Sequence, residues 1–244
     1  MFNLQHILYM VISGLLTAVF LILAGRYAKK ETTQNFILKF SAILTVVIHY
    51  SNLWVNFFAT GGSATIENNH ILPVYPCNVV MWTLLICALL QNKKGILFQI
   101  LGEFSFYAGI VGGVLGIVLN VNFDSNPTLA NYDILKGFLS HSTMLFGCIY
   151  LLAGGFIRLQ LFNTVSIAVG LVGMILCGLG INGLYTAFDM IPPDGMFLLS
   201  NPYVPFPPLV ITLALVLLLW IILTLRDLRK PRQERWYTKL LKRN

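Results

Sequence analysis

Long apolar stretches separated by short polar connections run along the whole chain. A hydrocarbon core of about 30 Å requires about 20 helical residues to cross it. The stretches long enough are residues 4–25, 36–58, 73–90, 96–119, 134–157, 164–187 and 207–225. The connections are too short to fold alone. The pattern predicts an all-α, polytopic membrane protein with seven transmembrane helices in one domain, residues 1–225, followed by a tail, residues 226–244.

Composition supports a membrane protein rather than a soluble one. Of the 244 residues, 57% are apolar and only 10% are charged, whereas soluble domains carry about 25% charged residues. The net charge of +7 would also suit a nucleic-acid-binding protein. The basic residues, however, occupy short connections and the tail and form no patch on a folded domain, so we expect no nucleic-acid partner.

The basic residues predict the orientation of the chain. With seven spans, 15 of the 16 basic residues fall on the side of the tail, and only Lys136 falls on the other. The positive-inside rule makes the basic side cytoplasmic, so we expect the N-terminus outside and the C-terminus in the cytoplasm. The setting would be the cell membrane, which is the plasma membrane in a bacterium. The tail would either contact anionic inner-leaflet lipids or serve as an ordinary anchor.

Polar side chains from four spans fall at one predicted depth. A rise of about 1.5 Å per residue puts them roughly 5–15 Å below the outer boundary. This layer consists of His49, Asn52, Cys77, Asn78, His141 and Asn182, with Asn56 nearer the surface. Polar groups in hydrocarbon are costly, so the layer is the first candidate for function. The alternative for each Asn is a structural hydrogen bond between helices, and for each His a packing role.

Three other polar residues are interpreted differently. Glu103 lies near the opposite boundary, and we expect it to pair with Lys39 or Arg158. His6 and His70 lie near the N-terminus and in a connection, where we expect them to be solvated.

Cys77 differs from the other cysteines in its local sequence. Pro76 suits the first position of a helix, where a missing N–H costs nothing. Cys77 would then lie in the first turn, where free N–H groups favour a thiolate and could bind an oxyanion. His141, at matching depth, could accept the thiol proton. The remaining cysteines, Cys87, Cys148 and Cys177, suit packing inside apolar stretches.

Short motifs along nearly the whole chain resemble those of the bacterial YwaF-like integral membrane family. They are His49-Tyr50 with Trp54, Leu72-Pro73-Val74-Tyr75-Pro76-Cys77-Asn78 with Trp82, Gly112-Gly113, the helix leading to His141, and Asn182 followed by Pro192 and Asn201-Pro202-Tyr203-Val204-Pro205-Phe206. That family resembles the eukaryotic transmembrane acyltransferases that build polyunsaturated ether phospholipids. The resemblance implies catalytic roles for Cys77 and His141. Gly183 departs from the pattern, in which an aromatic residue follows the Asn.

Three functions are consistent with the sequence. The first is an acyltransferase or transacylase without metal or cofactor, in which Cys77 carries the acyl group and His141 moves protons. His49, Asn52, Asn78 and Asn182 would bind the substrate, and membrane phospholipids or lysophospholipids would be the partners. The second is a zinc-dependent lipid hydrolase with His49, His141 and Cys77 as ligands. The third is a non-enzymatic lipid-binding or transport protein.

Overall fold

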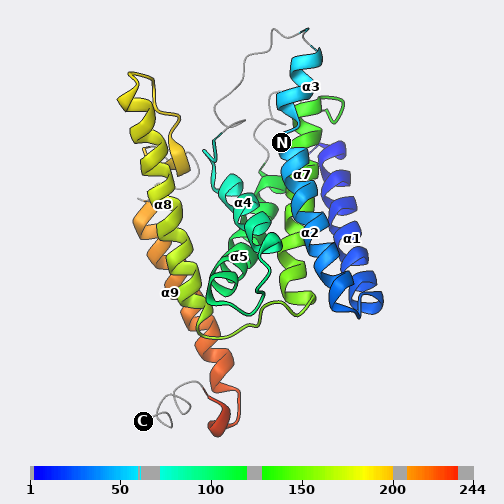
Figure 1. The fold of residues 1–244 in the computed structure, drawn as a ribbon, viewed down its shortest axis with the longest axis vertical. Helices are drawn as coiled ribbons and strands as arrows, with labels where there is room; N and C mark the ends of the chain where they lie inside the picture. The colour runs from blue at the N-terminus through cyan, green and yellow to red at the C-terminus, as the bar shows by residue number, and fades with distance from the viewer. Residues whose placement is uncertain (1–2, 60, 62–71, 120–127, 200–207, 236–244) are drawn as a thin grey trace.

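The structure is a computed structural model that describes residues 3–59, 61, 72–119, 128–199 and 208–235. All the regular elements in these ranges are helices (Figure 1). They are α1 (Leu4–Tyr27), α2 (Glu31–His49), α3 (Asn52–Ala59), α4 (Pro76–Leu89), α5 (Ile96–Val118), α7 (Tyr132–Ala153), α8 (Asn163–Ala187) and α9 (Pro208–Leu228), with the 3-10 helices η2 (Gly195–Phe197) and η3 (Arg232–Glu234). The all-α prediction is confirmed for these residues.

Each of the seven apolar stretches contains a helix. Over the described residues, five helices are long and apolar enough to cross a membrane: α1, the combined segment Glu31–Ala59, α5, α7 and α8. The apolar helix α4 is shorter, at 14 residues. Large apolar side chains such as Leu15, Ile22 and Leu176 are exposed on these helices, as expected for surfaces that face lipid. The chain is therefore a multi-pass membrane protein.

The second predicted span is broken rather than continuous. It begins at Glu31 instead of residue 36, and α2 ends at His49 before α3 starts at Asn52. At the break, the Ser51 hydroxyl donates to the Ile48 carbonyl over 2.5 Å. The Tyr132 hydroxyl donates to the same Ser51 oxygen over 2.5 Å, so the break is attached to the first turn of α7.

Four helices form the core of the bundle. α5 and α7 pack closely against each other, α2 packs against α7 and α4, and α4 packs against α5 and, more lightly, against α7. Glycine makes one of these approaches possible, because a Cβ on Gly109 of α5 would lie 2.8 Å from the Cβ of Cys148 on α7. Small residues allow transmembrane helices to approach in this way. Cys87 and Cys148 are free and fully buried, which agrees with a packing role.

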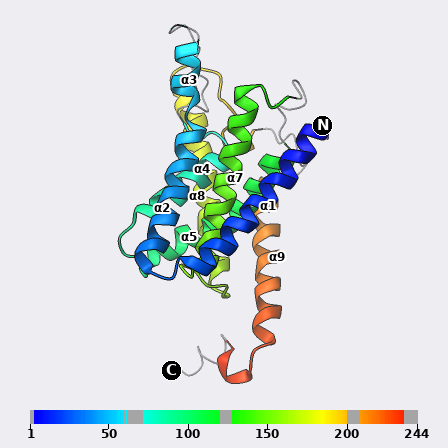
Figure 2. The ribbon, with the colours of Figure 1, turned by 90° about the vertical axis from the view of Figure 1, so that its right-hand side faces the viewer.

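The other helices lie at the edges of this core. Figures 1 and 2 show α1 against α7, and α8 and α9 together on the side of α5. The prediction that His6 is solvated is wrong. Its side chain is fully buried between α1 and α7, where Nε2 lies 2.8 Å from the Ile117 carbonyl oxygen and the ring packs on Phe138.

Some sequence-based predictions fall outside the described structure. His70, the 201–206 motif and the tail beyond residue 235 lie outside the described residues, as does the side chain of Asn56.

Candidate functional site

Cys77 lies in the first turn of α4, as the sequence predicts. Tyr75 is the extended N-cap residue and Pro76 is the first helical residue, a position where proline costs no hydrogen bond. Asn78 holds this turn, because its Oδ1 accepts from the Tyr75 backbone N–H over 3.1 Å. The Cys77 thiol is half-buried and lies 3.8 Å from the same oxygen. The partly exposed residue Cys77 is thus positioned by a fully buried neighbour.

Asn78 also joins α4 to the end of α2. Its Nδ2 lies 2.6 Å from His49 Nε2. Since the amide nitrogen can only donate, His49 accepts at Nε2. The neighbouring Tyr50 hydroxyl accepts from Trp82 Nε1 over 2.9 Å and interacts with both Cys77 and Asn78. His49 and Tyr50 therefore form the wall of the site on the α2 side.

His141 is held in one tautomer by its own helix. Its Nδ1 lies 2.7 Å from the Gly137 carbonyl oxygen, which can only accept, so Nδ1 carries the proton. In the neutral ring Nε2 is then free of a proton and can act as a base. The ring, which is half-buried, lies directly against Gly116 of α5, and a methyl group there would overlap it. Glycine at this position makes the space for the imidazole.

Lys136 is a residue of the site that the sequence did not single out. It lies on α7, five residues before His141, and its side chain is only 9% exposed. Its buried ammonium therefore lies on the same helix as the His141 imidazole. A signal was available, since Lys136 is the one basic residue on the predicted outer side.

Asn52 bonds to the first turn of α7. Its Nδ2 donates to Asp133 Oδ1 over 2.5 Å and ties α3 to the first turn of α7. With the bond between Ser51 and Tyr132, it fixes the entry of α7 beside the α2–α3 break. This contact gives Asn52 a structural role, which was the alternative considered for each asparagine.

Asn182 contacts the site through an intermediate segment. Its Oδ1 accepts from the Gly195 N–H over 2.7 Å. The next residue, Met196, donates its N–H to the Val74 carbonyl over 2.7 Å, and Phe197 stacks on Tyr75 with ring centroids 5.4 Å apart. Asn182 therefore fastens η2 against the chain that enters α4.

The η2 segment is strained where it meets α4. Asp194, Met196 and Phe197 all have left-handed backbone angles, with φ of 55°, 58° and 54°. Such conformations cost a non-glycine residue about 1–3 kcal/mol and persist only where the surroundings impose them. Here the imposing contacts are those of Asn182, Val74 and Tyr75. Strain of this kind clusters at functional sites.

A second buried polar group lies toward the other end of α5. The Glu103 carboxylate is 1% exposed and accepts hydrogen bonds from Ser166 Oγ (2.5 Å) and Gln160 Nε2 (3.3 Å). Asn163 Oδ1 accepts from the Gln160 N–H and from the Tyr107 hydroxyl. The expected ion pair with Lys39 or Arg158 is wrong, since neutral donors from α8 and its approach reach Glu103 instead. We call this set the Glu103 group, and Cys77, Asn78, His49, His141 and Lys136 the Cys77 group.

The geometry of the described residues does not support the zinc hypothesis. No three His, Cys, Asp or Glu side chains in this part of the chain lie close enough to hold a metal ion. His49 Nε2 instead accepts from Asn78. The described residues include a thiol (Cys77), an imidazole with one nitrogen free of a proton (His141) and a buried ammonium (Lys136), but no hydrogen bond joins the Cys77 thiol to the His141 ring.

Comparison with known proteins gives one match. A family model described as the TMEM164 family matches residues 1–226. No curated protein and no solved structure matches the chain.

Proposed function

The chain belongs to the TMEM164 family, and we propose that it is a membrane-embedded acyltransferase that moves a fatty acyl group between membrane lipids through a Cys77 thioester. The observation that carries the proposal is the tautomer of His141. Because Nδ1–H is donated to Gly137, Nε2 is left to take and return protons. The buried ammonium of Lys136, on the same helix as His141, supports the proposal as a source of positive charge for an oxyanion. So does the resemblance to the ether-phospholipid acyltransferases.

The proposed topology is seven spans with the N-terminus outside and the C-terminus in the cytoplasm, in the cell membrane. The 15 basic residues on one side support this orientation. Helices that alternate in direction through the bundle agree with it (Figure 1). The Cys77 group then faces the outer leaflet, and the C-terminal tail faces anionic lipids of the inner leaflet.

In the first step Cys77 takes the acyl group from a donor phospholipid. His141 Nε2 accepts the thiol proton, and the thiolate sulfur attacks the ester carbonyl carbon. The carbon–sulfur bond forms, and the ester carbon–oxygen bond breaks. The departing lysophospholipid oxygen takes the proton from His141. N–H groups at the start of α4 and the Lys136 ammonium stabilise the oxyanion that develops between these events.

In the second step the acyl group passes to an acceptor lysophospholipid. His141 Nε2 removes the proton of the acceptor hydroxyl, and the hydroxyl oxygen attacks the thioester carbon. A new ester bond forms, the carbon–sulfur bond breaks, and the sulfur takes back the proton. His49 and Asn78 position the thiol and the substrate head group. No net redox change occurs, so the cycle requires no redox cofactor.

The position of the site favours a phospholipid as the donor. Acyl-CoA is a cytoplasmic molecule. Lys93 follows the last turn of α4, whereas Cys77 lies at the opposite end of that helix. In the proposed orientation this end faces the outer leaflet, where phospholipids are the abundant acyl esters. The products are a lysophospholipid and a remodelled phospholipid.

Trapping of the thioester tests the proposal. Purified full-length protein is incubated with phospholipid carrying a labelled acyl chain, quenched in acid, and examined for label released by neutral hydroxylamine. Wild type should become labelled, and Cys77→Ala should lose at least about 99% of the label. Cys177→Ala is the matched control, because Cys177 is another partly exposed free cysteine. Equal labelling of wild type and Cys77→Ala would refute the mechanism.

A further inference from the structure

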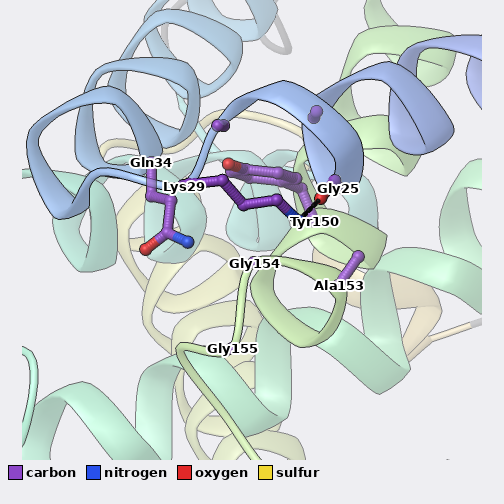
Figure 3. A pocket seen from close by; sticks show the side chains of 9 residues that line it. Gly25, Lys29, Gln34, Tyr150, Ala153, Gly154 and Gly155 are labelled. Carbon is purple, nitrogen blue, oxygen red and sulfur yellow. Dashed lines mark hydrogen bonds between the residues drawn. The ribbon is translucent and has the colours of Figure 1, made fainter.

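An open space lies where α1 and α7 end (Figure 3). It is a pocket of about 270 Å³ between the C-terminal ends of α1 and α7 and the first turn of α2. Lys29, Gln34 and Tyr150 are its larger lining residues, and the others are all alanine or glycine. Small side chains on the walls leave room for a group of several atoms beside the three polar side chains.

Tyr150 brings a buried hydroxyl to this pocket. Its ring is 1% exposed, stacks on Phe146 and packs edge-on against Phe156. The hydroxyl oxygen is inaccessible to solvent and has no hydrogen-bond partner among the described residues. A buried hydroxyl without a partner costs about 1–3 kcal/mol. After a small movement of the surrounding side chains, an acceptor atom in the pocket would remove that cost.

Lys29 and Gln34 supply further donors from two other segments. The Lys29 ammonium donates to the Gly25 carbonyl over 2.5 Å. Its side chain is exposed and long enough to turn toward a ligand. The half-buried Gln34 side chain makes no hydrogen bond within the described structure. Figure 3 shows the Tyr150 ring, the Lys29 chain and the Gln34 amide around the same space.

The charge of the rim favours an anion. Arg26 and Lys30 flank Lys29 in the sequence, and Glu31 is the acidic residue of this stretch. The carbonyl ends of α1 and α7 oppose an anion, but the Lys29 ammonium already binds one of these carbonyls. The Tyr150 hydroxyl, the Gln34 amide and the Lys29 ammonium all line this pocket. Together they can donate to an oxyanion that has several acceptor oxygens.

We propose that the Tyr150 pocket binds the phosphate group of a membrane phospholipid. A lipid is favoured over a free ion because the pocket opens beside α1, whose exposed face is apolar at Ile22 and Leu23 and ends in exposed Tyr27. Acyl chains would lie along that face, while the phosphate would enter between Lys29 and Tyr150. This site does not depend on the acyl-transfer function.

Native mass spectrometry of the full-length protein tests the proposal. The delipidated protein is titrated with phosphatidylglycerol, with diacylglycerol of identical chains, or with inorganic phosphate. The variants are Tyr150→Phe, which removes only the hydroxyl, Lys29→Gln, and the control Lys30→Gln, whose residue does not line the pocket. We expect one tightly held phosphatidylglycerol, with binding weakened about tenfold in each of the first two variants and less than twofold in the control.

Three results would overturn the proposal. Equal retention of phosphatidylglycerol and diacylglycerol would show that the phosphate is not recognised. An equal loss of phosphatidylglycerol binding in Lys29→Gln and Lys30→Gln, with binding unchanged in Tyr150→Phe, would show that general surface charge causes the effect. Displacement of the lipid by millimolar inorganic phosphate would identify a free ion as the ligand.

Discussion

Two buried polar groups of this protein, the Cys77 group and the Glu103 group, lie toward opposite ends of the helices that carry them. Each holds a residue that ionises and several hydrogen-bonding neighbours. In the Glu103 group the carboxylate oxygens bond to Ser166 and Gln160, and the residue is 1% exposed. In the Cys77 group the thiol and the imidazole are both half-buried. The two groups differ in access rather than in polarity.

This difference separates an interhelical connection from a candidate for chemistry. Glu103 joins α5 to α8 through neutral donors, which satisfies a buried carboxylate without leaving a reactive atom open. His141 uses one nitrogen for its own helix and keeps the other available. Buried polar residues in a membrane protein are therefore better judged by which atoms remain accessible than by how polar they are.

Replacement of His141 should have the largest effect. Gln at this position keeps a polar side chain but cannot take up a proton. We expect the rate of acyl labelling of Cys77 to fall about 10²–10⁴-fold, the range for loss of a general base. Glu103→Gln is the matched change in the other group, and its rate should stay within about twofold of wild type. If both variants lose the same activity, the division between the groups is wrong.

A methyl group on Gly116 should have the next largest effect. Gly116→Ala places Cβ where the His141 ring now lies, so the imidazole must turn away from its position. A misplacement of about 1 Å can cost about 10²-fold in rate, and we expect a loss of that order in labelling. Gly173→Ala is the control, because nothing lies within 4 Å of a Cβ there. An active Gly116→Ala variant would show that the position of His141 does not matter.

Loss of the Ser166 hydroxyl should affect stability rather than rate. Ser166→Ala removes a donor from a buried carboxylate, which should cost about 1–3 kcal/mol of unfolding free energy. The measurement is the thermal unfolding midpoint in detergent, together with the labelling rate per folded molecule. Thr33→Ala, at an exposed position of α2, should change the unfolding free energy by less than about 0.5 kcal/mol. An unchanged unfolding midpoint with a lower labelling rate would show that Ser166 belongs to the functional site.

The sequence predicted the helices better than the partners of their polar residues. Apolar length alone located a helix in each stretch, because a backbone in hydrocarbon must satisfy its hydrogen bonds internally. Depth also predicts that Cys77 and His141 fall in one layer, which stays a prediction. Depth does not specify which way a side chain turns around its helix, so His6 was expected in solvent and Glu103 in an ion pair.

The rotation of side chains around their helices and local breaks in the helices explain the remaining differences between the predicted and the observed contacts at the site. Asn52 shares the predicted layer, but it lies beyond the break after His49 and turns to Asp133. Asn182 reaches the site only through η2, a strained loop with no apolar periodicity to predict it. Lys136 was noted only as an exception to the charge pattern, although a basic residue on the predicted outer side was a reason to consider it with the polar layer.

The length of α4 has a consequence for the membrane around it. Fourteen residues extend only about 21 Å, well short of a hydrocarbon core of about 30 Å. Such hydrophobic mismatch is relieved by local thinning of the bilayer. Thinning beside Pro76 would bring the glycerol ester carbonyls of neighbouring lipids down to the level of the Cys77 sulfur. On the proposed function, bilayer thickness would then set how easily the donor ester reaches the nucleophile.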